Sequence, residues 1–420
     1  MEDQVSPKQV PLNESTHIPT AAAPLSDGSS GEVQGDGLAN IELVETAPVE
    51  TMLDIPEIRS TYEVWMEMIK GAKSTLDIET FYVASEAGEP LEEIIDTITD
   101  VSKRGVKVRI LADRKYHTTH PEPLDSLDKE KNIAVRLIDM AMLSGGVMHA
   151  KYFVIDGRDV FLGSQNFDWR SLKHVHELGL RVEDAKFAQI LADLFELDWK
   201  LAQAEDKETA AKRVKARAYQ VPVRVSGPDG ESTELTPVFS PLDWIPDREL
   251  WTEERLVELI DGAERDLLIQ TLSYSPVARD GSFYPRIDNA LRAAAIRGVA
   301  VKLIVADWSK ASPKVHHLKS LAVLPNIDVK FSTIPLWSKG YIPFARVEHR
   351  KLLVADSLAG WIGSSNLTKD YFYSSRNVGV IVKGKSVVST LRKVFFTDWM
   401  GPYTYFVDPA EDYIAPQVGE

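Results

Sequence analysis

The same pair of residues, a histidine and a lysine two positions later, occurs twice in this chain, first at His149 and again at His349. Each pair is followed by an aspartate and then, at a matching interval, by a Gly-Ser-x-Asn sequence. The first set contains His149, Lys151, Asp156, Ser164 and Asn166, and the second contains His349, Lys351, Asp356, Ser364 and Asn366. Two sets in register predict two halves of one site rather than a chance match.

The first set lies on a predicted β-hairpin. Residues 147–155 are rich in strand formers, and Asp156-Gly157 is a strong hairpin-turn signal. Because side chains two apart in a strand share a face, His149 and Lys151 should point into the same space. The aspartate stands at the turn, so it and its counterpart in the second set are predicted to be structural. The Gly-Ser-x-Asn sequence ends the return strand and would bring its serine and asparagine to the same rim.

These residue types suit chemistry on a phosphate. Lysine, serine and asparagine side chains are hydrogen-bond donors, and a cluster with two ammonium groups favours an anion with several oxygens. The residues predicted to bind phosphate are Ser164, Asn166, Ser364 and Asn366. The two lysines would repel a metal ion and no other sequence pattern predicts one, so neither a metal nor a cofactor is expected. One histidine would then attack phosphorus to form a covalent intermediate, while the other protonates the leaving oxygen.

Helices and strands alternate before the first set. Apolar residues at helical spacing over 62–69 precede an alternating strand over 75–83, an amphipathic helix over 91–103 and a strand over 105–113. This order predicts an α/β fold in which a mixed, largely parallel sheet is flanked by helices.

The second half of the chain repeats this order. The stretch 104–108 (Arg-Gly-Val-Lys-Val) matches 297–301 (Arg-Gly-Val-Ala-Val), and Asp198-Trp199 recurs as Asp398-Trp399. The offset between the halves is smaller at the first of these matches than from the motif histidine onward, so the length differences fall in loops. A repeat of this size predicts two similar domains. We expect them to pack as a pseudo-two-fold pair with one active site at their interface.

The predicted domain boundaries follow composition. Residues 1–55 are rich in Pro, Ser, Gly, Glu and Asp and are expected to form a disordered acidic tail. The two halves are expected at 56–205 and 235–405. The polar stretch 206–234 would connect them, and 406–420 would form a C-terminal tail.

Composition excludes some kinds of chemistry. The chain has 44% hydrophobic and 26% charged residues, which is ordinary for a globular protein. It contains no cysteine, and this excludes disulfides, thiolate zinc sites and cysteine nucleophiles. Most of the net charge of −15 falls in residues 1–57, so it says little about the active cleft. No signal peptide or membrane-spanning apolar stretch is visible, so we expect a soluble protein whose compartment the sequence does not assign.

The paired His-x-Lys-x4-Asp motifs with their Gly-Ser-x-Asn partners resemble the phospholipase D superfamily. The resemblance extends from about Thr61 to Tyr405. The stretches 163–172, 284–292 and 396–403 are most similar to the branch that contains animal phospholipases D3 and D4. The resemblance implies a phosphodiester hydrolase that works through a phosphohistidine intermediate.

The resemblance also points to Glu177 as a catalytic residue. It follows His149 at a spacing where superfamily members often have a carboxylate that orients the motif histidine. The matching residue in the second half is the uncharged Asn377. We therefore expect Glu177 to orient His149 and to make it more basic than His349. On this basis His149 is predicted to be the nucleophile and His349 the acid/base.

Three functional hypotheses follow. The similar branch implies a 5′ exonuclease on single-stranded nucleic acid. The nearest alternative is a hydrolase or transphosphatidylase of phosphatidylglycerol- or cardiolipin-like lipids, which would contact a membrane surface transiently. A non-catalytic phosphate-binding protein is the third, although all four motif histidines and lysines are present. Because both half-sites lie on one chain, no partner protein is expected to be required for catalysis.

Other polar and aromatic residues are harder to assign. His117 and His120 are interpreted as loop residues, because no carboxylate–histidine set completes a metal site around them. The histidines at 174, 176, 316 and 317 are interpreted as surface or packing residues. Several aromatic residues near predicted strand ends are candidates to stack on bases or to line an acyl groove. They include Phe81, Tyr82, Trp308, Trp337, Phe344 and Tyr371.

Overall fold

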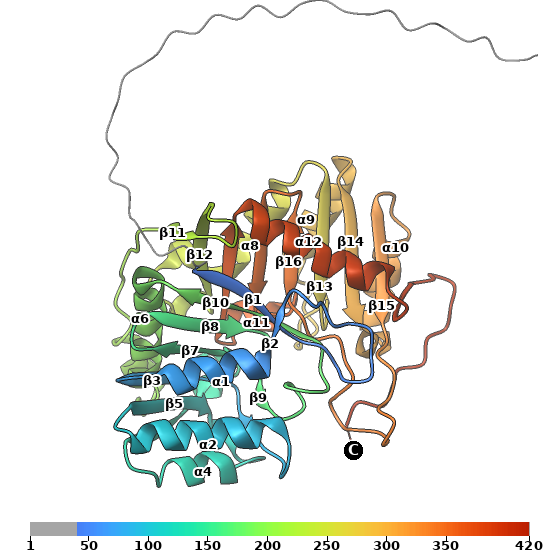
Figure 1. The fold of residues 1–420 in the computed structure, drawn as a ribbon. Coiled ribbons are helices and arrows are strands. Elements are labelled where there is room, and N and C mark those ends of the chain that lie inside the picture. The colour runs from blue at the N-terminus through green and yellow to red at the C-terminus, as the bar shows by residue number, and fades with distance from the viewer. Residues whose placement is uncertain (1–39, 420) are drawn as a thin grey trace, which may run out of the picture. The chain divides into compact units, whose positions relative to one another are not determined.

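Two mixed β-sheets, one in each half of the chain, form the framework of the protein (Figure 1). The structure is a computed structural model that describes residues 40–419. The first sheet has the strand order β2-β1-β10-β8-β7-β3-β5-β6, and the second has β11-β12-β18-β17-β16-β13-β14-β15-β19. Both sheets belong to one compact unit.

The strands of the first sheet are β1 (Ile41–Thr46), β2 (Arg59–Ser60), β3 (Thr75–Glu79), β5 (Lys107–Asp113), β6 (Ile133–Ile138), β7 (Tyr152–Ile155), β8 (Asp159–Gly163) and β10 (Glu177–Glu183). Those of the second are β11 (Val223–Ser226), β12 (Ser232–Ser240), β13 (Asp266–Thr271), β14 (Ala300–Ala306), β15 (Ile327–Ser332), β16 (Leu352–Ala355), β17 (Ala359–Gly363), β18 (Asn377–Lys383) and β19 (Thr404–Phe406). A separate pair is formed by β4 (Val83–Ala84) and β9 (Phe167–Asp168).

The helices of the first half are α1 (Thr61–Gly71), α2 (Pro90–Lys103), α3 (Arg114–His117), α4 (Glu122–Leu127), α5 (Met140–Ser144), α6 (Ala185–Leu201) and α7 (Lys207–Ala211). Those of the second are α8 (Thr252–Asp261), α9 (Arg286–Ile296), α10 (Lys314–Ala322), α11 (Lys369–Tyr373) and α12 (Lys385–Met400). Within residues 40–419, none of the helices has both the length and the apolar character needed to cross a membrane.

The helix α6 begins at a side-chain cap and buries one face. The Asp184 carboxylate accepts hydrogen bonds from the backbone N–H groups of Lys186 and Phe187, both at 2.8 Å, and so starts α6. Trp199 near its end is buried, as is Trp399 in the equivalent helix α12. The prediction that these two tryptophans belong to the core is therefore confirmed.

The predicted duplication is present in the sheets. The order β10-β8-β7-β3-β5-β6 of the first sheet recurs as β18-β17-β16-β13-β14-β15 in the second, which confirms an α/β fold of two similar halves. Within this repeated order, only β3-β5-β6 and β13-β14-β15 pair in parallel. The parallel part is smaller than expected, because the motif hairpin and the strand after it add by antiparallel pairing.

The expectation of a disordered tail over 1–55 is wrong for its last part. Residues Ile41–Thr46 form β1, which pairs antiparallel with β10 and buries Ile41 and Val44. The acidic composition concealed this strand, since Glu45 is buried where it pairs with Arg350 of the second half. The rest of that expectation, over 1–39, lies outside the described residues.

Two other predicted segments contain strands of the second sheet. The expected connection over 206–234 contains β11, and β12 begins at Ser232, so the second sheet starts earlier than the expected boundary at 235. The expected C-terminal tail over 406–420 starts in β19, which pairs antiparallel with β15. β11 has four residues and β19 has three, and so short a run gives too little alternation to predict a strand.

The two halves contact each other through a pair of matching β-bridges. Met148 bridges to Arg376, and Glu348 bridges to His176, so each bridge joins the residue before a motif histidine to the other half. The positions in the two bridges differ by the same offset as the two motif histidines. The pseudo-two-fold relation therefore places each motif histidine beside the segment of the other half that leads into β10 or β18.

Buried arginines join the halves next to these bridges. Arg376 of the second half donates to the Asp198 carboxylate at 2.7 Å and to the carbonyl of Trp244 at 2.7 Å, and all its side-chain surface is buried. Arg350 of the second half donates to Asp398 of its own half at 2.7 Å and, across the halves, to the Glu45 carboxylate. The two repeated aspartates of the Asp-Trp sequences therefore anchor arginines, which sequence spacing did not predict.

The Arg376→Met substitution is expected to lower the free energy of unfolding by about 3–5 kcal/mol, because Asp198 would stay buried without its partner. Chemical denaturation monitored by tryptophan fluorescence measures this change. Arg248→Ala is the matched control, since its ion pair with Asp243 lies at the surface and should contribute less than about 1 kcal/mol. Equal stabilities of the two variants would contradict the inter-half role of Arg376.

Candidate active site

Both motif histidines line one cavity of about 770 Å³. Each precedes its motif strand and is held by the backbone of the other half: the His149 N–H donates to the Arg376 carbonyl at 2.8 Å, and the His349 N–H donates to the His176 carbonyl at 2.9 Å. The predicted convergence of the two motifs is therefore present. It results from the inter-half bridges rather than from either hairpin alone.

His149 is oriented by an amide of the other half. Its Nδ1 lies 3.0 Å from Oδ1 of Asn377. The Asn377 amide nitrogen donates to the carbonyl of Tyr371 at 2.9 Å, so the amide oxygen is the atom left to face the imidazole. The hydrogen therefore resides on Nδ1 of His149, which leaves its Nε2 with a free lone pair.

His349 is oriented by a carboxylate of the other half. Its Nδ1 lies 2.7 Å from Oε2 of Glu177, a residue with no exposed side-chain surface. Glu177 also accepts hydrogen bonds from the hydroxyls of Ser164 and Ser171. The two hydroxyl donors thus fix the Glu177 carboxylate in place, and the carboxylate can still accept a hydrogen bond from the His349 imidazole.

The expectation that Glu177 orients His149 is wrong, because the partners are exchanged between the halves. Glu177 begins β10 directly after the bridge between His176 and Glu348, and this bridge brings it beside the second histidine. Asn377 begins β18 after the equivalent bridge and reaches His149 in the same way. Sequence spacing relates each residue to the histidine of its own half and contains no sign of the crossing.

The two histidines differ in their affinity for a proton. Burial lowers the pKa of His149 well below its usual value, and the charges of Lys151 and Lys351 lower it further. Burial also lowers the pKa of His349, but the Glu177 carboxylate opposes this shift. His349 is therefore the imidazole that holds a proton more readily.

The two motif lysines are buried. Nζ of Lys151 donates to the carbonyl of His149 at 2.7 Å, and Nζ of Lys351 donates to the carbonyl of His349 at 2.6 Å. In the part of the chain that the structure describes, neither forms an ion pair with a carboxylate, so each keeps two donors for another acceptor. Burial lowers the pKa of Lys351 to about 7, although Glu177 opposes the shift.

The serines of the Gly-Ser-x-Asn sequences do not lie where we expected. Ser164 donates its hydroxyl to Glu177, and Ser364 donates to Oδ1 of Asn377 at 3.0 Å. A hydroxyl has one hydrogen to give, so both serines position the partner of a histidine and are not free to bind phosphate. This part of the expectation is wrong.

The asparagines fit the expected role better. Asn166 lines the cavity, and the buried amide nitrogen of Asn366 has no acceptor among residues 40–419. Oδ1 of Asn366 lies 3.2 Å from the Thr271 hydroxyl, which orients the amide. A buried donor without a partner is costly unless a ligand uses it, so Asn366 remains a candidate phosphate donor.

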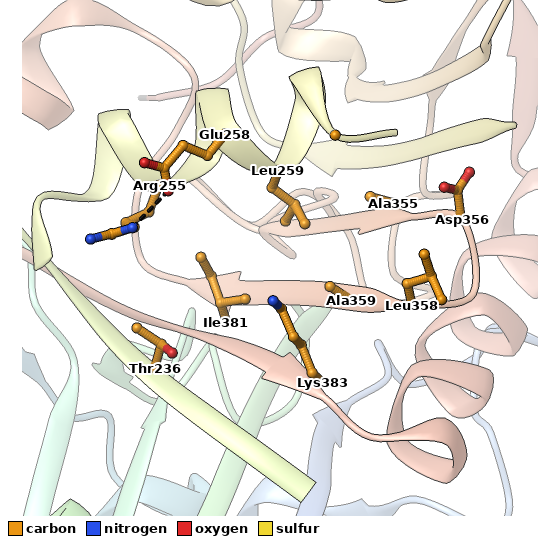
Figure 2. Close-up of a pocket in the computed structure, with 11 residues that line it drawn as sticks. Thr236, Arg255, Glu258, Leu259, Ala355, Asp356, Leu358, Ala359, Ile381 and Lys383 are labelled. Carbon is orange, nitrogen blue, oxygen red and sulfur yellow. Dashed lines mark hydrogen bonds and ion pairs between the residues drawn. The ribbon is translucent and has the colours of Figure 1, made fainter. Parts of the chain in front are cut away.

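The motif aspartates lie at the hairpin turns. Asp156 has a φ of 52° and accepts backbone N–H groups of Ser74 and Thr75 at 2.7 and 2.8 Å. Burial acts to raise its pKa, but these backbone hydrogen bonds outweigh it and the pKa is lowered. Asp356 makes equivalent bonds and lines a different cavity, between α8 and β16–β18 (Figure 2). Both aspartates therefore brace their hairpins at a distance from the imidazoles.

Aromatic rings surround His149. Its ring centroid lies 5.1 Å from that of Phe81 and 4.9 Å from that of Tyr371. Phe81 packs in turn on Tyr116, at 4.1 Å between centroids, and all of these rings line the cavity. Their position near strand ends was the only signal in the sequence.

A buried ion network that sequence reasoning missed lies behind His349. Nδ1 of His176 is 2.8 Å from Glu348, and Asp398 lies close to both. The guanidinium of Arg350 already donates to Asp398, so its positive charge occupies this group of carboxylates and would repel a metal ion. His176 was interpreted as a surface or packing residue, and the structure places it in this network.

A family model described as "Cardiolipin synthase, PLD-like domain" matches residues 65–199 and 256–399, once in each half. The matched ranges contain both His-x-Lys motifs and both Gly-Ser-x-Asn sequences. The chain belongs to the phospholipase D superfamily. It is accordingly a phosphodiesterase of that superfamily.

Proteins of known function support the same family. The chain is 31% identical over 408 residues to 5'-3' exonuclease PLD3 of Bos taurus, with 89% of this chain and 81% of the relative covered. It is 28% identical to Phospholipase D Z of Dictyostelium discoideum, with 87% and 90% covered. Its fold is similar to that of phosphatidylserine synthase from Haemophilus influenzae, with a TM-score of 0.62, 14% identity and 88% of each chain covered.

Proposed function

We propose that this phosphodiesterase acts without a metal through a phosphohistidine on His149, and that it is a 5′ exonuclease of single-stranded nucleic acid. The mechanism is supported by the different hydrogen-bond partners of the two imidazoles. His149 contacts the neutral amide of Asn377, whereas His349 contacts the carboxylate of Glu177. Two histidines in one cavity with different proton affinities suit a nucleophile and an acid.

The first step uses both imidazoles. Nε2 of His149 attacks phosphorus, and the bond from phosphorus to the leaving oxygen breaks. His349 transfers its proton to that oxygen, so the product leaves as an alcohol. The two lysines and Asn366 supply the donors that hold the non-bridging oxygens as negative charge develops on them.

In the second step His349 acts as a base instead of an acid. His349, now neutral, takes a proton from a water, which attacks phosphorus as the bond to Nε2 of His149 breaks. His349 is then protonated again and His149 is neutral. An alcohol in place of the water would give transfer instead of hydrolysis.

We propose the same roles for the two histidines as the sequence predicted, but for a different reason. His149 was expected to be the nucleophile because of a carboxylate neighbour, and that neighbour belongs to His349. His149 instead suits attack because its pKa is lowered well below the usual value and its Nε2 lone pair is free. His349 suits the acid because Glu177 stabilises its protonated form.

The substrate proposal rests on the relatives and on the cavity lining. Two relatives at 28% and 31% identity are named 5'-3' exonucleases, and aromatic side chains such as Phe81, Tyr116 and Tyr371 line the cavity. Rings of this kind stack on bases without regard to sequence. The alternative, a phospholipid hydrolase or transphosphatidylase, is favoured by the relative named Phospholipase D Z, and apolar walls would also accept acyl chains.

The two substrates can be separated in one experiment. The protein is incubated with end-labelled single-stranded DNA and, separately, with phosphatidylglycerol vesicles, both in the presence of EDTA. We expect DNA shortened from its 5′ end and intact lipid. The double variant that combines His149→Ala with His349→Ala is the control for contaminating enzymes. Lipid turnover with intact DNA would reject the nuclease proposal.

Activity should fall as the pH rises through about 7. The Lys351 ammonium, with a pKa of about 7, loses its proton in that range, and the cavity then loses positive charge that holds the phosphate. The lowered pKa of His349 acts in the same direction, since the acid must be protonated before attack. A pH profile of kcat/KM should therefore have its maximum on the acid side of 7. A rise in kcat/KM from pH 6 to pH 9 would contradict this account.

A further inference from the structure

The two halves differ in length at the loop that leads into the second motif. Residues 139–151 connect β6 to β7 in the first half, whereas residues 333–351 connect β15 to β16 in the second. The second half therefore has the longer connection. We call residues 333–347 the rim loop, because several of them line the active-site cavity.

Phe344 is the most exposed apolar side chain of the rim loop that reaches the cavity, with 53% of its surface exposed. Its φ is +59°, and that of Arg346 is +54°. The left-handed region is unfavourable for a bulky residue and costs on the order of 1–3 kcal/mol. Such a conformation persists only where the surrounding structure holds it.

The C-terminal segment provides part of this hold. The N–H of Phe344 donates to the carbonyl of Val418 at 2.8 Å, and the Tyr341 hydroxyl donates to the carbonyl of Gly419 at 3.0 Å. A Cβ on Gly419 would lie 3.1 Å from the Phe344 ring, so backbone and ring are closely packed. The segment 415–419 thus fixes the backbone of Phe344 directly.

The first half of the chain holds the other side of the rim loop. Arg170 donates to the carbonyl of Pro343 at 3.0 Å, and its guanidinium carbon lies 6.0 Å from the centre of the Phe344 ring. The N–H of Arg346 donates to the carbonyl of His174 at 2.9 Å. Phe344 is therefore held from two directions at the mouth of the cavity.

The N-terminal segment adds a third contact. Arg346 donates to the carbonyl of Val49 at 2.7 Å, and the Ser338 hydroxyl donates to the Glu50 carboxylate at 2.7 Å. Segments from both ends of the described chain therefore meet at a loop that is longer in the second half than in the first. Phe344 has no group that could react, so these contacts do not serve the chemical step itself.

We propose that Phe344 determines specificity by stacking on a base of the single strand as it leaves the site, and that residues 415–419 hold it in place. The half-exposed ring presents a flat apolar face to the cavity, and a base matches that face. The Arg170 guanidinium beside it is paired with Asp168, so it helps to hold the ring in place. Phe344 and His349, the proposed acid, lie on the same connection between β15 and β16 and line the same cavity, and we therefore assign Phe344 to the leaving strand. This inference rests on the nuclease function proposed above.

The test compares a single-stranded DNA with an abasic single strand of the same length, which has the same phosphates but no bases. Phe344→Ala should raise KM for the DNA by about 5- to 100-fold, in line with the loss of one stacking contact, and leave kcat within about twofold. Its KM for the abasic strand should equal that of the wild type. Phe344→Trp should restore the wild-type KM. Phe283→Ala is the matched control, because this ring is 63% exposed and does not line the cavity.

Removal of residues 415–420 tests the hold on Phe344. The truncation keeps Tyr413, which packs on the core, and should raise KM for the DNA in the wild type. In the Phe344→Ala background it should have no further effect, because the two changes act on one contact. An equal effect in both backgrounds would overturn the role of the segment. A wild-type KM in Phe344→Ala would overturn the stacking role, whereas intact DNA with the wild-type protein would overturn the nuclease function itself.

Discussion

The His149→Ala substitution is expected to reduce turnover of any phosphodiester by about 10³-fold or more, whatever its leaving group, while the protein stays folded. His149 provides the atom that bonds to phosphorus, and this atom is lost when the imidazole is removed. Steady-state rates with DNA and with bis(p-nitrophenyl) phosphate measure the loss, and circular dichroism checks the fold. Full activity in this variant would contradict the two-histidine mechanism.

The His349→Ala variant sharpens this expectation, because an acid is needed only for a poor leaving group. Turnover of DNA should fall by about 10²–10⁴-fold, since the leaving alkoxide would depart without a proton. Release of p-nitrophenolate needs no proton, so the first step with bis(p-nitrophenyl) phosphate should be affected much less. The burst of p-nitrophenolate in rapid mixing measures that step. An equal loss of the burst in both histidine variants would contradict the assignment of His349 as the acid.

Lys351→Met and Lys151→Met are the second pair of changes with a large expected effect. Each variant should lose about 10²–10³-fold in kcat, because a buried donor to the non-bridging oxygens disappears where charge develops. Methionine fills a similar volume without charge, so the packing around the site should be preserved. Initial rates with bis(p-nitrophenyl) phosphate measure the loss.

Lys383→Met is the matched control for the lysine variants. Lys383 lines the cavity in Figure 2, which contains neither motif histidine, so its replacement should leave activity unchanged. If Lys351→Met retained wild-type kcat, the cavity between the histidines would not be the place where phosphate reacts.

The sequence allowed the repeat, the fold class and the convergence of the two motifs to be predicted. Exact spacing carries this information, because the offset between His149 and His349 is shared by the residues that follow them and relates two copies of one domain. The turn role of Asp156 followed from the Asp-Gly signal in the same way. Local patterns of this kind depend on neighbours along the chain, which a sequence displays directly.

The crossed partners could not be predicted, because they depend on contacts between halves. Glu177 was assigned to the motif histidine that precedes it in its own half, while the bridge at His176 carries it to His349. Glu45 was assigned to a disordered tail for a similar reason, since only the fold brings Arg350 to it. In both cases the role of a charged residue depends on a partner that is distant in the chain.

The identity of the phosphorylated residue tests the central claim most directly. The protein is mixed with a labelled phosphodiester, quenched within one turnover under alkaline conditions that preserve phosphohistidine, and digested for peptide mapping. We expect the label on the peptide that contains His149, and none in the His149→Ala variant. Label on the peptide that contains His349, or a full turnover with no covalent intermediate on either histidine, would contradict it.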